Sequence, residues 1–168
     1  MKRYLSKVDT ATTGGRYDVT PLFADPQAFD ALVTDLAAPF EASAPDFVAC
    51  LDALGFILGT ALARHLGAGV LPVRKGHKLP TATDFETCVD YSGTQKRLEI
   101  RKDILHPGAK VLLVDDWVET GAQAAAAIRL IERQGAVVVG IAAVCIDETD
   151  KTLPLRQKYT VRSVWEPS

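Results

Sequence analysis

The sequence is poor in cysteine, and its few cysteines are far apart. Only Cys50, Cys88 and Cys145 occur among 168 residues. An odd number of separated cysteines argues against a disulfide framework, and no Cys-x-x-Cys pair is present. The three histidines are equally dispersed, which makes a zinc site improbable. We therefore expect reduced cysteines that pack as small apolar side chains in a cytoplasmic protein.

Long apolar runs and a large excess of one charge are also missing. No apolar stretch reaches the length that spans a bilayer, and no N-terminal stretch resembles a signal peptide. The formal net charge of −2 argues against nucleic acid or an anionic membrane as the main partner. With 48% hydrophobic and 24% charged residues, the composition is that of a globular protein. A chain of this length suits one domain.

Helix and strand patterns alternate along the chain. The predicted helices cover residues 26–38, 54–65 and 122–134. The predicted strands cover residues 46–49, 70–74, 110–114 and 137–145. A loop that contains Pro80 and a hairpin that pairs 87–91 with 96–100 interrupt this order. We expect a single α/β domain over residues 1–168, with a mainly parallel central sheet flanked by helices and a loose N-terminal arm at residues 1–15.

The stretch VLLVDDWVETGAQ, at residues 111–123, carries the most chemical information. Four apolar residues of a predicted strand end in Asp115 and Asp116, two adjacent carboxylates that repel each other and add nothing to a core. The short loop ETGAQ then opens an alanine-rich helix. Ligands of open α/β sheets bind at the carboxyl ends of the strands. We therefore expect a binding site here rather than a helix start decorated with solvated acids.

The loop after the two acids suits a phosphate. Gly121 permits a tight turn, Thr120 offers a hydroxyl and an amide, and the helix start supplies free N–H groups and the positive end of its dipole. Carboxylates beside such a loop can accept hydrogen bonds from sugar hydroxyls or hold a divalent metal through water. The pattern predicts a ligand with a phosphate at one end and a ribose in the middle. The expected phosphate loop comprises Glu119, Thr120, Gly121, Ala122 and Gln123.

The stretch resembles the phosphoribosyl diphosphate (PRPP) motif of type I phosphoribosyltransferases. Other stretches follow one another as in the adenine branch of that family, namely DVTPLFADP, LGFILGTALARHLG, LPVRKGHKLP, VDYSG and LEIRKDILHPG. The resemblance covers roughly residues 15–147. It implies the type I phosphoribosyltransferase fold, with a small hood and a flexible flap. It also implies a reaction in which a purine nitrogen attacks C1 of PRPP and pyrophosphate leaves.

The resemblance also assigns roles around PRPP. Asp115 and Asp116 would bind the ribose hydroxyls and steer the shell of Mg²⁺, which would be held through PRPP and water with no direct protein ligand. Arg74, Lys75 and Lys78 would contact pyrophosphate, in part across the interface of a homodimer.

Other roles concern the base. Asp90 and Tyr91 would lie on the flap that closes over the site, and Asp90 would be a candidate proton acceptor or donor for the base. Arg16 and Tyr17 would lie in the hood that covers the base.

Four departures from the family surround the expected ligand. Leu54 stands where the family has an arginine that reaches the pyrophosphate region. Glu119 and Gln123 change the usual ATGGT phosphate loop to ETGAQ. Arg16 and Tyr17 replace the hood's phenylalanine and arginine, and the flap has DYSG instead of EYG.

These departures leave three hypotheses open. The first is a Mg²⁺-dependent enzyme that transfers phosphoribose to adenine or a related purine. The second is a regulatory protein that binds PRPP or a nucleotide without turnover. The third is an enzyme of the same fold with a different acceptor base. Pyrophosphate release with a panel of bases distinguishes them.

Overall fold

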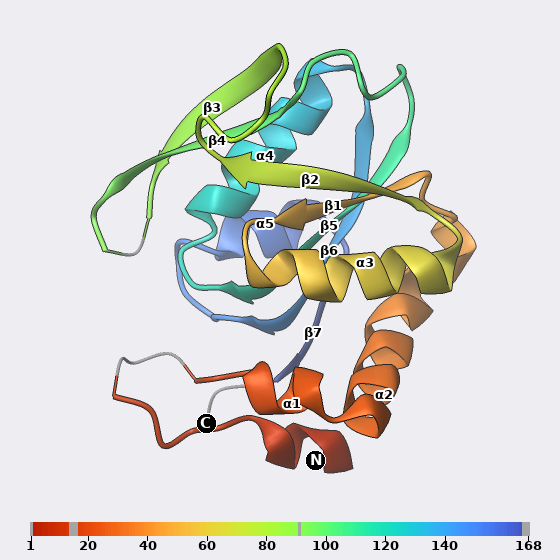
Figure 1. Ribbon diagram of the computed structural model, residues 1–168, viewed down its shortest axis with the longest axis vertical. Coiled ribbons are helices and arrows are strands. Elements are labelled where there is room, and N and C mark those ends of the chain that lie inside the picture. Colours follow the sequence, from red (N-terminus) through yellow and green to blue (C-terminus); the bar gives the residue numbers. More distant parts are fainter. Residues whose placement is uncertain (1, 14–16, 91, 166–168) are drawn as a thin grey trace.

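Seven strands form one sheet in the computed structural model, which describes residues 2–13, 17–90 and 92–165 (Figure 1). The strands are β1 (Phe47–Leu51), β2 (Gly69–Lys75), β3 (Thr83–Val89), β4 (Gln95–Arg101), β5 (Lys110–Val118), β6 (Val137–Ile146) and β7 (Val161–Trp165). Their order in the sheet is β3-β4-β2-β1-β5-β6-β7. The pairs β1–β2, β1–β5, β5–β6 and β6–β7 are parallel, whereas β4 is antiparallel to both β2 and β3. The predicted mainly parallel sheet is confirmed.

Helices surround this sheet. The α-helices are α1 (Thr20–Ala24), α2 (Pro26–Ala37), α3 (Leu54–Leu66), α4 (Ala122–Arg133) and α5 (Leu153–Lys158), and two 3-10 helices are η1 (Arg3–Lys7) and η2 (Ala38–Ser43). Asp25 caps α2 by accepting hydrogen bonds from two backbone amides of its first turn. Gly67, in the left-handed region at φ +70°, caps the C-terminus of α3. Within the described ranges, no helix combines the length and the apolar character that crossing a membrane requires.

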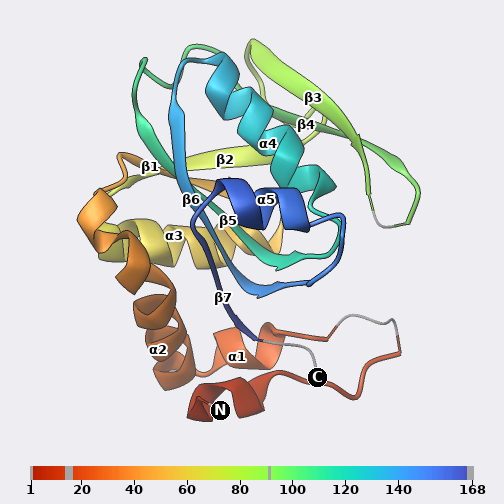
Figure 2. The ribbon, with the colours of Figure 1, turned by 180° about the vertical axis from the view of Figure 1, so that it is seen from behind.

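The central strands are apolar on both faces because helices cover both sides of the sheet. Along β5, Leu112 and Val114 pack in one core cluster with α2 and α3, whereas Val111 and Leu113 pack in the other cluster with α4. Figure 2 shows α4 and α5 in front of the sheet when the molecule is viewed from behind. Because successive side chains of a strand point to opposite faces of the sheet, one apolar run contributes to two cores.

Strand β5 is longer than its sequence suggests. We expected it to end at Val114, but it continues through both acids to Val118. Its parallel neighbour β1 pairs with it only as far as Cys50 opposite Val114, so beyond this point β5 is paired on the β6 side alone. The acids are therefore part of the strand, at a place where its other edge is open.

The hairpin β3–β4 is also longer than predicted. A hairpin is present where residues 87–91 and 96–100 predict one, but its ladder runs from Thr83 opposite Arg101 to Val89 opposite Gln95. The expected loop around Pro80 is correspondingly shorter. Because Gln134, after α4, donates hydrogen bonds to Asp84 Oδ2 and to the Arg101 carbonyl, both at 2.9 Å, the base of the hairpin is tied to the α4 layer.

The expectation of a loose N-terminal arm was wrong for its first part. Residues 3–7 form η1, and the side chains of Tyr4, Leu5 and Val8 are buried against α2 and its neighbours. The Tyr4 hydroxyl donates a 2.6 Å hydrogen bond to Asp35 of α2. The apolar residues of this segment are too few to show a periodic pattern in the sequence. Helix η1 lies beside α1 at the end of the molecule that β7 approaches (Figure 1).

Candidate active site

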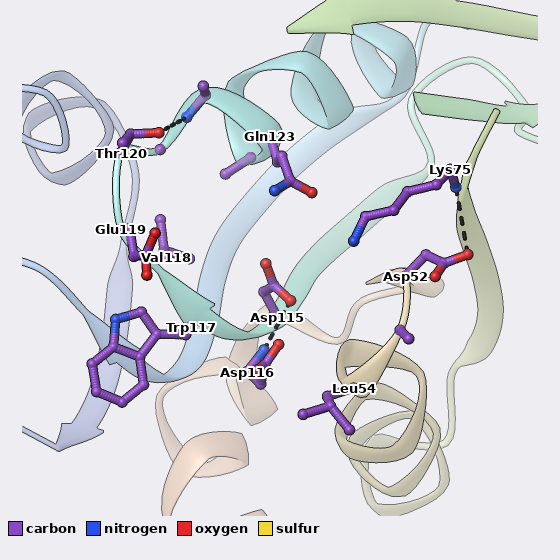
Figure 3. Close-up of a pocket in the computed structure, with 14 residues that line it drawn as sticks. Asp52, Leu54, Lys75, Asp115, Asp116, Trp117, Val118, Glu119, Thr120 and Gln123 are labelled. Atoms are coloured by element: carbon purple, nitrogen blue, oxygen red, sulfur yellow. Dashed lines mark hydrogen bonds between the residues drawn. The ribbon is translucent and has the colours of Figure 1, made fainter. Parts of the chain in front are cut away.

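A cavity of about 170 Å³ lies at the carboxyl ends of β1 and β5. Three parts of the chain line it, namely residues 52–54, Lys75 and residues 115–124. Figure 3 shows Lys75 reaching from β2 across the cavity towards Asp115 and Gln123. The structure therefore brings together the two acids, the whole expected phosphate loop and one of the three expected pyrophosphate-binding cations.

The two acids are held at the open edge of β5. The Asp116 amide donates a 2.9 Å hydrogen bond to Asp115 Oδ1, and both residues are half-buried. The start of α3 approaches them closely at Gly55. A Cβ atom there would lie 3.0 Å from the Val114 carbonyl oxygen and 3.3 Å from Asp115 Oδ1. The absence of a side chain at Gly55 allows α3 to pack against the strand that carries the acids.

The phosphate loop turns at Gly121, which no other residue could replace without strain. Gly121 has φ +72°, and a Cβ atom there would lie 2.8 Å from Leu155 Cδ1. It precedes α4, a helix of 12 residues whose N-cap makes no side-chain hydrogen bond. Thr120 Oγ1 accepts only a long 3.4 Å bond from the Ala122 amide. The positive end of α4 is thus presented to the cavity, as anion binding requires.

The other two expected cations, Arg74 and Lys78, meet at a carboxylate that we did not predict. Asp52 Oδ2 lies 3.2 Å from Arg74 Nε and 3.5 Å from Lys78 Nζ, and the Asp52 side chain is only 8% exposed. Burial raises the pKa of Asp52, but the hydrogen bond from Arg74 and the nearby lysines outweigh it, so the pKa is lowered. Asp52 lines the cavity and holds two cations at its margin.

A signal for Asp52 was present in the sequence. It follows the apolar strand VACL as Asp115 follows VLLV, so both acids lie at the carboxyl ends of neighbouring parallel strands. A single acid after a strand is a weak pattern. Only the pairing of β1 with β5 shows that the two acids share one edge.

The flap acid Asp90 lies apart from the cavity lining. Asp90 Oδ1 accepts hydrogen bonds from the Ser92 amide and hydroxyl, at 2.9 and 2.6 Å, and from the Thr94 amide at 3.1 Å. These hydrogen bonds, led by that of the Ser92 hydroxyl, lower the pKa of Asp90. In this arrangement the carboxylate closes the hairpin turn. Tyr91, which follows it, lies outside the described residues, as does Arg16 of the hood.

Tyr17 of the hood contacts an aromatic cluster beside the cavity. Its ring meets those of Trp117 and Trp165 edge to face, at centroid distances of 5.7 and 5.8 Å. Trp117 lines the cavity and is 7% exposed, and its indole N–H donates a 3.0 Å hydrogen bond to Asp147 Oδ1. The hood, β5 and β7 are therefore joined at one end of the cavity.

The donor set of the cavity suits a magnesium ion that arrives with a phosphate ligand. Among the residues that the structure describes, no group of three His, Cys, Asp or Glu side chains could hold a metal. Mg²⁺ is usually bound by one or two carboxylates together with substrate phosphates and water. Asp115 and Asp116 supply carboxylate oxygens of that kind at the cavity edge.

Comparisons with known proteins agree with this geometry. Residues 23–166 match the phosphoribosyl transferase domain family. Over 125 residues the chain is 48% identical to the adenine phosphoribosyltransferase of Jannaschia sp. (strain CCS1), a match that covers 74% of this chain and 69% of that protein. The chain belongs to the adenine phosphoribosyltransferase family. The resemblance inferred from its sequence motifs is thereby confirmed.

Solved structures of adenine phosphoribosyltransferases share the fold. The structure from Rhodothermus marinus superposes with a TM-score of 0.82 at 33% identity and covers 95% of this chain and 94% of its own. The structure from Giardia lamblia, complexed with 9-deazaadenine, has a TM-score of 0.82 at 30% identity and covers 93% and 89%. The type I phosphoribosyltransferase fold predicted for the chain is confirmed.

Proposed function

We propose that the protein transfers the phosphoribosyl group of PRPP to adenine or a closely related purine, releasing pyrophosphate and a nucleoside monophosphate. The observation that carries this proposal is the composition of one cavity. It combines the exposed N-terminus of α4, the two carboxylates of β5 and the ammonium group of Lys75. The helix start suits a phosphate, the carboxylates suit the hydroxyls of a ribose, and the ammonium group suits pyrophosphate.

Each part of PRPP has its own partners in the chain. The amides of residues 121–123 and the hydroxyl of Thr120 hold the 5-phosphate at the start of α4. Asp115 and Asp116 accept hydrogen bonds from the ribose hydroxyls. Lys75 contacts the pyrophosphate group, together with Arg74 and Lys78 once these turn from Asp52.

Loss of pyrophosphate leaves positive charge on the ribose and negative charge on the leaving group. The cations of β2 and its loop stabilise the leaving group where its charge develops. Mg²⁺, when bound with PRPP, neutralises part of the same charge. Hydrogen bonding by Asp115 and Asp116 orients the ribose for attack at C1. For Asp90, proton transfer with the base requires the hairpin to bring its carboxylate towards the cavity.

Base recognition falls to the hood and the flap. Tyr17 lies beside the cavity through its contact with Trp117. Arg16, which precedes it in the sequence, and Tyr91 of the flap are the other residues proposed to recognise the base. Adenine is the proposed acceptor because the family to which the chain belongs is named for it.

The cavity also carries a feature that favours the second candidate, a binding protein without turnover. Four of the charged residues that line it are acids and one is a lysine. These residues are Asp52, Asp115, Asp116, Glu119 and Lys75. Leu54 supplies no charge where the family has an arginine. An acidic cavity weakens the grip on pyrophosphate, so ligand binding with little turnover is the specific alternative.

Pyrophosphate release from PRPP with Mg²⁺ tests the function against adenine, guanine, hypoxanthine, xanthine, uracil and orotate. We expect release with adenine and none with the pyrimidines, because the family acts on a purine. If none of the six bases gives pyrophosphate release but calorimetry still shows PRPP binding, the result would support a binding protein without turnover. Turnover with another base but not with adenine would identify a changed acceptor.

We also propose that the protein is a cytoplasmic homodimer. Ile57 of α3 and Val70 of β2 expose 48% and 42% of their surface, and large apolar side chains at a surface suit an interface. Among the described residues, Cys50, Cys88 and Cys145 form no disulfide, as expected in a reducing compartment. Light scattering is expected to give twice the 18.1 kDa mass of one chain. A mass of one chain at micromolar concentration would reject the dimer.

A further inference from the structure

A buried acid on β4 has no part in the chemistry proposed above. Glu99 is 1% exposed and lies between Leu98 and Ile100, both fully buried. Its Oε1 accepts hydrogen bonds from the Lys78 amide at 2.8 Å and from the Leu79 amide at 3.2 Å. Its Oε2 lies 3.5 Å from Arg97 Nε. A buried carboxylate is costly unless it is bound in this way.

Glu99 is charged at neutral pH. Burial raises its pKa, but hydrogen bonds from the backbone of Lys78, His77 and Leu79 and from the Arg97 side chain outweigh burial, so the pKa is lowered. All its backbone partners belong to one loop, so what the carboxylate stabilises is that loop.

The loop is shaped around this carboxylate. It leaves β2 after Lys75, and the Gly76 amide donates a 2.8 Å hydrogen bond to the Arg97 carbonyl. A Cβ atom at Gly76 would lie 3.1 Å from the Arg97 side chain. His77 then adopts φ +61°, in the left-handed region, and the following amides turn towards Glu99. Successive backbone amides that converge on one anion form an anion-binding nest.

We propose that Glu99 is a positioning residue that fixes the pyrophosphate-binding loop, and this inference rests on the proposed function. Glu99 binds the backbone of the loop from the sheet side, and Asp52 binds the Lys78 side chain from the cavity side. Both carboxylates thus hold the loop at Lys78, and Asp52 also accepts a long 3.5 Å hydrogen bond from the Lys75 amide at the other end. Glu99 touches no ligand and acts through the two lysines, which need a fixed backbone to reach one pyrophosphate group together.

The test is calorimetric binding of two probes to the full chain, inorganic pyrophosphate with Mg²⁺ and ribose 5-phosphate. Glu99→Gln removes the charge and replaces one of the two accepting oxygens with an NH2 group, which donates. We expect pyrophosphate affinity to fall about tenfold. Ribose 5-phosphate affinity is expected to change by less than about twofold, because α4 and β5 hold that ligand. Glu86→Gln is the matched control. Glu86 lies on β3 of the same hairpin and pairs with Arg129 and Arg133, away from the loop.

Each outcome bears on the inference. An equal loss for both probes means that Glu99 supports the fold only, and unchanged pyrophosphate affinity means that the loop does not need it; either result overturns the proposal. Wild-type protein that binds ribose 5-phosphate but not pyrophosphate also overturns it, whereas binding of neither probe rejects the proposed function itself. Should Glu99→Gln not fold, Glu99→Asp keeps the charge but withdraws the carboxylate by about 1.5 Å. The same selective loss is expected.

Discussion

Replacement of both Asp115 and Asp116 by asparagine is expected to abolish measurable PRPP binding while the protein stays folded. A hydrogen bond to a charged group contributes about 1.5–3 kcal/mol, so loss of two carboxylates lowers affinity on the order of a hundredfold or more. Asparagine has nearly the same shape, and its carbonyl oxygen can still accept the bond that the Asp116 amide donates to Asp115. Stability is expected to change little, since both residues are half-buried at an open strand edge.

Calorimetric titration with PRPP and Mg²⁺, together with thermal unfolding, measures both effects. The control is Asp30→Asn with Asp103→Asn, which removes the same charge from two exposed residues outside the cavity lining. If the control weakens binding as much, the effect is one of net charge alone. Unchanged affinity in the folded Asp115/Asp116 variant would reject the assignment of these acids to the ribose.

The acids and the phosphate loop could be predicted because their chemistry is contiguous in the sequence. A strand, two carboxylates, a glycine turn and a helix start follow within residues 111–123, and the structure brings all of these residues to one cavity. Asp52 and Glu99 could not be found in this way. Their partners on β2 and its following loop lie at least 20 positions away, and only strand pairing brings them together.

The extents of the elements show the same limit. Helix α4 was predicted to within a residue because its apolar spacing and Gly135 are local signals. The end of β5 depends instead on its pairing with β6, which continues to Val118 opposite Ile146 after β1 has stopped pairing at Val114. No local pattern records this. The 3-10 helix η1 and the edge strand β7 were missed because each is five residues long and gains its burial from distant neighbours.

The second large effect is expected from Leu54→Arg, which restores the family's arginine and should raise kcat/KM for PRPP about tenfold. Leu54 lines the cavity two residues after Asp52 and packs at the margin of the α2–α3 core. A new charged hydrogen bond to pyrophosphate contributes about 1.5–3 kcal/mol. A cation at the N-terminus of α3 costs about 0.3–1 kcal/mol. The balance is close to the 1.4 kcal/mol that corresponds to a tenfold change.

Asp52 decides how much of this gain is realised. Its carboxylate already holds Arg74 and Lys78, so a third cation beside it weakens its hold on them and leaves more positive charge for the ligand. We therefore expect KM for PRPP to fall more than KM for adenine. Steady-state kinetics with both substrates measures the two values. Leu54→Gln, which is polar but neutral, separates the charge from the loss of apolar packing. A folded Leu54→Arg variant with no gain would place the limit in the hood or the flap, where Tyr17 and Asp90 differ from the family.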